Sequence, residues 1–288
     1  MSVPTRVSVI VPHYRDLRGL DACLTDLLDQ TTQPFEIVVA DNNSPEGEAA
    51  IAAVVRGRAK LTIVTEKGAG PARNGGVAAA TGDILAFTDS DCRPARDWLE
   101  QGLAALADYD LVGGRVDVFP EHRDRITPAE GFDIVFGFDN RGYVLDKKFT
   151  VTANLFCRRE VFDRVGGFLS TVSEDVEWSH RAQSKGYTLG YADAAIVNHP
   201  ARRTWEELLA KWRRVNSETH QLHVMYRRGS LRWLARCLAL PLSAVVHAPK
   251  ILLAKQLPPA ARGPAVLMLF RLRVWRSLDC LRLLTARS

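Results

Sequence analysis

Two aspartates one residue apart, Asp89 and Asp91, come directly after a short apolar run in this chain of 288 residues. Carboxylates spaced in this way after a strand can point in the same direction where the chain turns. Their oxygens are hard ligands suited to Mg²⁺ or Mn²⁺, and such an ion can bridge to phosphates. A polar turn with an aspartate capping the next helix explains the same residues, and on spacing alone it is the stronger alternative. The triplet Asp89-Ser90-Asp91 therefore predicts a metal site only where other residues support it.

These acids must be held by a framework, and strand and helix patterns alternate over the first 110 residues. Expected strands cover 6–12, 35–40, 61–64 and 83–88, and expected helices cover 17–30, 46–56, 71–80 and 98–106. This alternation predicts an α/β fold with a doubly wound, mostly parallel central sheet flanked by helices. Ligands of such sheets lie beyond the carboxyl ends of the strands. Asp41 and the Asp89/Asp91 pair both follow strands, so we expect them to face one crevice.

The pattern is less regular from about 112 to 168, where strand-like pieces cover 111–119 and 149–157. A helix is expected over 174–185, because acids in a first turn suit the helix dipole. A short strand at 194–197 precedes His199. A capping box at 204–207 then opens a basic helix that runs to about 228.

Several motifs follow one another in a distinctive order. They occupy residues 7–12, 39–44, 72–76, 82–91, 164–168, 173–178 and 197–199. In this order and spacing the chain resembles the family 2 inverting glycosyltransferases, which have the GT-A fold. The resemblance covers about residues 6–215. It implies transfer of a sugar from a nucleotide-diphosphate sugar, UDP more than GDP, to a hydroxyl of a glycan or lipid-linked acceptor, with Mn²⁺ or Mg²⁺ as cofactor.

The resemblance also implies roles for the metal-binding residues. Asp91 is the expected principal metal ligand, and Asp89 is expected to contact ribose, sugar or metal-bound water, or to bind the metal. His199 is the expected additional ligand or phosphate contact, although a single histidine can equally be structural. Cys92 stands where the family often has another acid.

The donor-binding residues implied by the resemblance are Pro12, Tyr14, Asp41 and Arg73, together with Asp89. Asp41 can accept from a uracil N–H or a ribose hydroxyl, but a turn-forming aspartate before Pro45 explains it as well. Arg73 would neutralise the diphosphate. It lies near a helix start, where a cation is unfavourable unless an anion binds, and this favours the phosphate contact over a surface arginine.

Catalysis by such an enzyme needs a carboxylate that takes the proton of the acceptor hydroxyl. The resemblance assigns this role to Asp175, with Glu174 as a support or acceptor contact. A merely acidic helix start is the alternative. Residues 211–214 do not match the Gln-x-x-Arg-Trp motif of processive synthases, so transfer of a single sugar is favoured.

Two other functions fit parts of the sequence. A sugar-nucleotide nucleotidyltransferase also binds a diphosphate and a metal, but it needs a glycine-rich first loop, and residues 12–16 contain no glycine. A non-catalytic basic protein that binds membrane or nucleic acid would explain the charged tail but not the ordered acids.

The net charge of +5 is unevenly distributed. Residues 231–288 carry ten Lys or Arg and one acid, which gives 10 − 1 = +9, and the first 230 residues therefore carry 5 − 9 = −4. Leucine, valine and tryptophan interleave with these cations, as in helices that lie on an anionic membrane. Apolar packing on the catalytic domain with the cations in solvent is the alternative. No nucleic-acid partner is expected, and the oligomeric state is not indicated.

The sequence thus predicts a catalytic domain over 1–215, with a donor half at 1–110 and an acceptor half at 111–215. Residues 216–288 form a helical basic extension, whose five prolines predict broken amphipathic helices. No run of about 18 uncharged apolar residues appears, so no spanning helix is expected. The five scattered cysteines lack metal or disulfide spacing and favour a reducing compartment. We expect a cytoplasmic protein on the inner face of the membrane.

Overall fold

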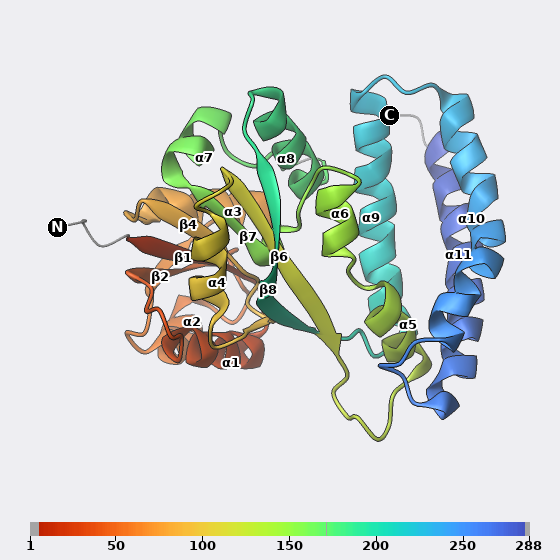
Figure 1. The fold of residues 1–288 in the computed structure, drawn as a ribbon, viewed down its shortest axis with the longest axis horizontal. Helices are drawn as coiled ribbons and strands as arrows, with labels where there is room; N and C mark the ends of the chain where they lie inside the picture. Colours follow the sequence, from red (N-terminus) through yellow and green to blue (C-terminus); the bar gives the residue numbers. More distant parts are fainter. Residues whose placement is uncertain (1–5, 171, 286–288) are drawn as a thin grey trace. The chain divides into compact units, whose positions relative to one another are not determined.

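The computed structural model describes residues 6–170 and 172–285, and Arg287 of the basic tail lies outside them. Its centre is an eight-stranded sheet with the order β3-β2-β1-β4-β7-β6-β8-β5 (Figure 1). The strands are Val7–His13 (β1), Glu36–Asp41 (β2), Lys60–Ile63 (β3), Ile84–Phe87 (β4), Arg93–Pro94 (β5), Leu111–Phe119 (β6), Leu155–Arg158 (β7) and Leu189–Pro200 (β8).

The helices of the sheet-containing part follow the strands closely. They are Leu17–Leu28 (α1), Glu48–Val55 (α2), Ala69–Ala79 (α3), Trp98–Ala105 (α4), Asn140–Leu145 (α6), Arg159–Val165 (α7) and Glu174–Ser184 (α8), with a 3₁₀ turn at Thr152–Asn154 (η1). The remaining helices are Pro128–Phe136 (α5), Trp205–Met225 (α9), Ser230–Leu252 (α10) and Pro259–Thr285 (α11).

The sheet is mixed. β1 pairs in parallel with β2 and β4, and β2 pairs in parallel with β3. β7 is antiparallel to both β4 and β6, and β5 is antiparallel to β8. The predicted α/β fold is confirmed, and β1 to β4 are paired in parallel, with a helix between each strand and the next.

Helix α3 can approach the sheet closely because its inner face is built from small residues. A Cβ added at Gly76 would lie 2.6 Å from Ile10 of β1 and 3.3 Å from Ala40 of β2. The helix follows Gly68, whose φ of +129° is accessible mainly to glycine. This close packing brings Arg73, on the same helix, toward the ends of the parallel strands.

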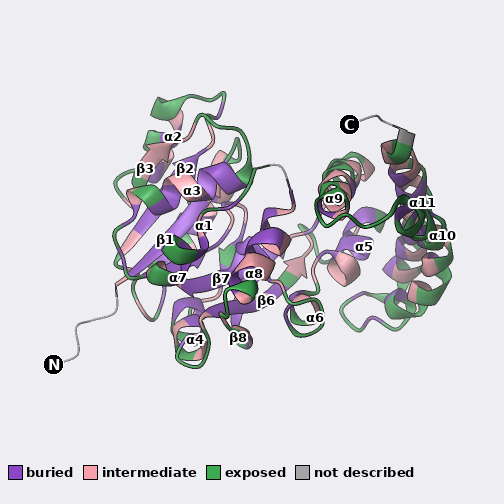
Figure 2. Ribbon diagram, turned by 90° about the horizontal axis from the view of Figure 1, so that it is seen from above, coloured by how far each residue is buried: buried purple, intermediate pink, exposed green. Residues whose placement is uncertain are grey.

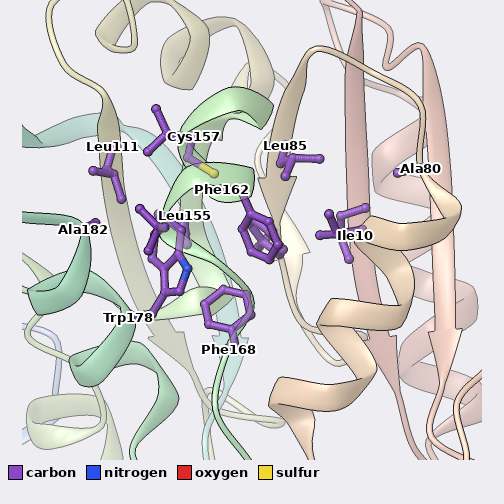
Figure 3. Packing of buried hydrophobic residues seen from close by; sticks show 14 of the residues in the cluster. Ile10, Ala80, Leu85, Leu111, Leu155, Cys157, Phe162, Phe168, Trp178 and Ala182 are labelled. Atoms are coloured by element: carbon purple, nitrogen blue, oxygen red, sulfur yellow. The ribbon is translucent and has the colours of Figure 1, made fainter. Parts of the chain in front are cut away.

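An aromatic cluster joins α7 and α8 to the middle of the sheet (Figure 3). Phe87 of β4 contacts Phe168 edge to face, with ring centroids 5.6 Å apart, and Phe168 contacts Trp178 of α8 at 5.3 Å. Trp178 also donates from Nε1 to the backbone oxygen of Gly166. Because β4 leads directly to Asp89 and α8 begins at Glu174, this core fixes two parts of the candidate site to each other.

The chain divides into two compact units. The first contains residues up to Asp117 with 139–170 and 174–199, and the second contains 118–138, 171–173 and 200 onward. The second unit is helical and packs α5, α9 and α11 around Phe132, Leu208, Leu269 and Leu272. Three helices between 112 and 168 were not expected, although α5 opens with a complete capping box formed by Thr127 and Glu130.

The prediction of broken tail helices was wrong. Pro241 and Pro249 lie inside α10, and Pro264 lies inside α11. A proline at 241 has no N–H for the carbonyl of Cys237. That carbonyl instead accepts a 2.8 Å hydrogen bond from Ser277 Oγ on α11, so the neighbouring helix replaces the missing donor.

One helix of the tail bears on the expectation that no segment spans a membrane. Among the residues described, α10 has the length and the apolar composition needed to cross a membrane. Of its most apolar segment, 22% is buried. Core helices of soluble proteins can be equally long and apolar. In Figure 2 the strands β1 and β2 are buried, whereas much of α10 is exposed.

Candidate active site

Acidic side chains gather at the carboxyl ends of the parallel strands. Asp41 ends β2, and Asp89 and Asp91 follow β4, with β1 between these two strands. The register pairs His13 of β1 with Asp41. The predicted placement of these acids at one edge of the sheet is thus confirmed.

Asp41 is the centre of a buried hydrogen-bond cluster. Its Oδ1 lies 2.7 Å from His13 Nδ1 and accepts from Ser44 Oγ at 2.6 Å, while Oδ2 accepts from Ser44 N at 2.8 Å. Ser44 Oγ in turn accepts from the backbone N–H of Arg15. The turn role weighed for Asp41 is therefore present, and the carboxylate also links the loops that follow β1 and β2.

His13 has one ring nitrogen without a partner. Asp41 as a carboxylate only accepts hydrogen bonds, so Nδ1 of His13 carries a proton. The other nitrogen, Nε2, is buried and has no hydrogen-bond partner among the described residues. The imidazole therefore retains a polar atom at the edge of the sheet where nucleotides bind in folds of this kind.

Arg73 is buried and connects two acids of the site. Its Nη2 donates to Asp89 Oδ1 at 2.7 Å, and its Nη1 donates to Glu174 Oε1 at 3.0 Å. Burial lowers the pKa of Arg73, but the charges of Asp89 and Glu174 outweigh burial and raise it above its ordinary value. The surface-arginine alternative is wrong, and the positive charge is already paired with two carboxylates.

Asp175 lies beside this pair at the start of α8. Its Oδ1 accepts from Thr152 Oγ1 at 2.8 Å and from Thr152 N at 3.3 Å. Burial and the neighbouring charge of Glu174 raise the pKa of Asp175 to about 7, against the opposing effects of Arg73 and Thr152. A carboxylate with such a pKa can take and release a proton near neutral pH.

Asp91, Cys92 and His199 form a possible metal site. Their ligand atoms all lie within 4.8 Å of one another, and His199 Nε2 is 3.5 Å from Asp91 Oδ2. Neighbouring ligands of an octahedral Mg²⁺ are about 3 Å apart, so the pair fits one ion with little movement. Burial and the charge of Asp91 raise the pKa of the Cys92 thiol well above its ordinary value, which leaves it protonated and a poor ligand.

The base-contacting loop expected at Pro12 and Tyr14 is next to the Asp41 cluster in the chain. The Tyr14 side chain is 52% exposed, and the guanidinium of Arg15 lies 5.1 Å from its ring centroid. Within the described residues, no hydrogen bond joins Tyr14 to Asp41. The aromatic face is therefore available for stacking, but the structure does not bring it to the carboxylate.

Two residues that contact the site acids were not singled out from the sequence. His13 could have been found by placing the ends of the first two expected strands side by side, since both were expected in one parallel sheet. Thr152 has no local signal, because its contact with Asp175 depends on how η1 and α8 are placed by the antiparallel part of the sheet.

Comparison with known proteins agrees with this geometry. The model of the family "Glycosyl transferase family 2" matches residues 8–168. Glycosyltransferase AglE of Haloferax volcanii is 34% identical over 243 residues, which cover 81% of this chain and 79% of that protein. A pre-mycofactocin glycosyltransferase of Mycobacterium tuberculosis is 28% identical over 219 residues, and the match covers 71% of this chain but 45% of that protein.

A solved structure shares the fold over nearly the whole chain. It is a mannosyltransferase from Pyrobaculum calidifontis in complex with GDP-Man and Mn²⁺. The TM-score is 0.65 at 22% identity, and the match covers 99% of this chain and 87% of the other. The likeness confirms the GT-A type of fold. The matched family model and the relatives show that this chain is a glycosyltransferase and belongs to glycosyl transferase family 2.

Proposed function

We propose that this enzyme is a non-processive, inverting glycosyltransferase that moves one sugar from a nucleotide-diphosphate sugar to a hydroxyl acceptor, with Asp175 as general base. The observation that carries the proposal is the environment of Asp175. Its carboxylate is fixed on one side, its pKa lies near neutrality, and Arg73 and Asp89 are close by.

The two neighbouring acids are suited to different tasks. Glu174 is buried and accepts from Arg73, so its charge is compensated and its oxygen is occupied. Asp175 has no ion-pair partner within the described chain, and its Oδ2 accepts no hydrogen bond there. We therefore assign proton transfer to Asp175 and a supporting role to Glu174.

The reaction follows from these positions. The acceptor oxygen attacks the anomeric carbon while its proton moves to Asp175, and the bond to the diphosphate breaks on the opposite side of the carbon. Direct displacement inverts the configuration, since no enzyme nucleophile intervenes. Asp91 and His199 would hold Mn²⁺ or Mg²⁺, with Asp89 close by, and the ion would stabilise the negative charge of the departing diphosphate.

The donor would bind at the carboxyl ends of the parallel strands, where Asp41 and Asp89 lie. We propose that Asp41, Pro12 and Tyr14 contact the nucleoside and that Asp89 contacts the ribose or sugar. Nη1 and Nη2 of Arg73 already donate to Glu174 and Asp89, so a diphosphate bound here would share the guanidinium with these two acids. UDP is favoured by the sequence, whereas the similar solved structure holds GDP-Man, so both bases must be tested.

The tail supports a contact with anionic lipid. Between Arg236 and Lys250, α10 contains no Lys, Arg, Asp or Glu. Leu242 and Val246 in this stretch are 72% and 74% exposed. Apolar side chains flanked by cations suit a helix that lies in an anionic membrane surface. We propose that residues 1–215 carry catalysis, with a donor half at 1–110 and an acceptor half at 111–215, and that 216–288 bind the cytoplasmic membrane face near a lipid-linked or cell-surface glycan acceptor.

A donor screen tests the enzyme proposal. Purified full-length protein is incubated with UDP- and GDP-sugars and Mn²⁺, and release of nucleotide diphosphate is measured with and without a lipid-linked acceptor. The proposal expects turnover of one donor class, loss of turnover in Asp175→Asn, and an inverted anomeric configuration by NMR. Retained configuration would exclude the inverting mechanism, and release of pyrophosphate would support the nucleotidyltransferase alternative.

A further inference from the structure

Thr152 is hydrogen-bonded to the proposed base. Its hydroxyl donates to Asp175 Oδ1 at 2.8 Å, and its backbone N–H approaches the same oxygen at 3.3 Å. An ionised carboxylate only accepts hydrogen bonds, so the buried hydroxyl of Thr152 must be the donor in this pair. Both donors of Thr152 therefore meet one oxygen of Asp175.

The turn that carries Thr152 is held from both sides. Asn154 of η1 accepts from Trp98 Nε1 and donates to the backbone oxygens of Arg115 and Ala195. On the other side, Val151 N donates to Asn140 Oδ1 at 3.1 Å. Thr152 is 2% exposed. A side chain fixed in this way can set the orientation of its partner instead of following it.

The second oxygen of Asp175 is left open. Within the described chain, Oδ2 accepts no hydrogen bond, so the two oxygens are not equivalent. We propose that Thr152 is a positioning residue of the transfer reaction, which anchors Asp175 through Oδ1 and leaves Oδ2 to receive the proton of the acceptor hydroxyl.

The step balances without a further reactant. The acceptor O–H bond breaks and its proton goes to Asp175 Oδ2, while the oxygen forms the bond to the anomeric carbon. The electron pair of the old glycosidic bond leaves with the diphosphate. Thr152 keeps its proton throughout. This inference rests on the proposed role of Asp175 as general base.

The charged groups around Asp175 are Glu174, Arg73 and Asp89. Arg73 donates its hydrogen bonds to the other two acids and not to Asp175. Thr152 is thus the hydrogen-bond donor that favours the ionised form of this carboxylate. Without its hydroxyl, Asp175 should bind its proton more tightly, and the enzyme should need a higher pH for activity.

Thr152→Val keeps the shape of the side chain and removes the hydroxyl, whereas Thr152→Ser keeps the hydroxyl. In the valine variant we expect the acid limb of the kcat/KM profile to move up by about one pH unit. A shift of this size corresponds to the loss of one hydrogen bond to a charged group. The maximal kcat should fall about tenfold because the base is less well oriented. Thr152→Ser should restore both values.

Thr150→Val provides a matched control. Thr150 is equally buried and lies two residues earlier, but its hydroxyl pairs with Asn140. This variant should lower the melting temperature without moving the acid limb. An acid limb in Thr152→Val that stays at the wild-type position, in protein that is folded by circular dichroism, overturns the inference.

Asp175→Asn separates the two proposals. If Asp175→Asn is inactive but the Thr152→Val limb does not move, only the role of Thr152 is wrong. If Asp175→Asn retains activity, the assignment of the base is wrong, and the inference about Thr152 fails with it.

Discussion

Arg73 donates from its buried guanidinium to Asp89, with 2.7 Å between Nη2 and Oδ1. Through Nη1 the same group also holds Glu174 at the start of α8. One side chain of α3 thus joins the acid that follows β4 to the helix that carries the proposed base. The residues proposed for the donor and for proton transfer are thus connected by a single cation.

Replacement of Arg73 should therefore affect both stability and catalysis. Arg73→Ala leaves two partly buried carboxylates without compensation and should cost about 3 kcal/mol of unfolding free energy. Arg73→Lys keeps the charge but loses the fork that reaches two acids, and its kcat should fall at least tenfold at nearly normal stability. Chemical denaturation and steady-state kinetics measure the two effects. Equal kcat in Arg73→Lys and wild type would show that the double contact is dispensable.

The pH dependence of the reaction should follow Asp175. Burial and Glu174 raise the pKa of this carboxyl to about 7, so kcat/KM should rise with pH up to about 7 and then level off. At pH 6 the activity should be about one tenth of the plateau. The measurement is a pH profile with a saturating metal concentration, and a flat profile between pH 5 and 8 would contradict the assignment.

Asp175 should also reduce stability where it is charged. Its pKa is raised on folding, so the folded state binds more protons than the unfolded state between about pH 4 and 7. The contribution of this group to stability is present below pH 4 and is lost as the pH rises through 7. Asp175→Asn should therefore raise the melting temperature at pH 8 more than at pH 5. The opposite order in thermal melts would show that the carboxylate is favourably charged in the native state.

Removal of the metal should weaken nucleotide binding through Asp91 and His199. Treatment with EDTA should abolish transfer, and Mn²⁺ should restore it. Asp91→Asn should raise the Mn²⁺ concentration needed for half-maximal activity at least tenfold, and His199→Ala should have a smaller effect of the same sign. Cys92→Ser tests the protonated thiol and should leave the metal requirement nearly unchanged. Full activity after chelation would remove the metal from the proposal.

The His13–Asp41 pair should control affinity for the donor. His13→Asn can place an amide donor where Nδ1 lies and so preserve the contact with Asp41, whereas His13→Ala removes it. Calorimetric titration with UDP and GDP should show about tenfold weaker binding for the alanine variant and a smaller loss for asparagine. Equal losses in the two variants would indicate that the contact with Asp41 is not what matters.

Membrane binding should depend on the exposed face of α10. Val246→Glu introduces a charge at a position that is 74% exposed, so the fold should be unaffected. Full-length protein should sediment with vesicles that contain phosphatidylglycerol, and the variant should remain in solution. Leu28→Glu, an exposed change on α1 that is 43% exposed in the wild type, is the matched control. Wild-type protein that stays in solution would refute the membrane contact.

The sequence was sufficient for the parallel part of the fold. The apolar runs and the residues that end them predicted the bounds of β1 to β4 to within one or two residues. The acids at the ends of these strands could therefore be located as well. It was insufficient between 112 and 168, because α5, α6 and α7 contain nine, six and seven residues and carry weak helical periodicity. The prolines of the tail were misinterpreted, since tertiary contacts compensate for the missing backbone donors.

The candidate site shows the same limit. Asp41, Asp89, Asp91 and Asp175 were found because motifs and strand ends are local features. Arg73 and His199, which contact Asp89 and Asp91, were found as well. Thr152 was not found, because it meets Asp175 only where η1 and α8 come together in the fold. The pairing of Arg73 with Glu174 likewise joins residues about one hundred positions apart, which no window of sequence contains.

Pro241 makes the two tail helices depend on each other. The carbonyl of Cys237 on α10 takes its donor from Ser277 of α11, and Trp233 Nε1 on α10 donates to the carbonyl of Cys280 on α11. Each helix thus donates a side-chain hydrogen bond to the backbone of the other, and the bond from Ser277 replaces a donor that α10 lacks. Cutting the chain before α11 would remove the 27 residues of that helix. It would also leave the carbonyl of Cys237 in α10 without its hydrogen-bond donor. The helical hairpin of α10 and α11, and not α10 alone, is therefore the smallest segment that could be fused to another protein to test membrane binding.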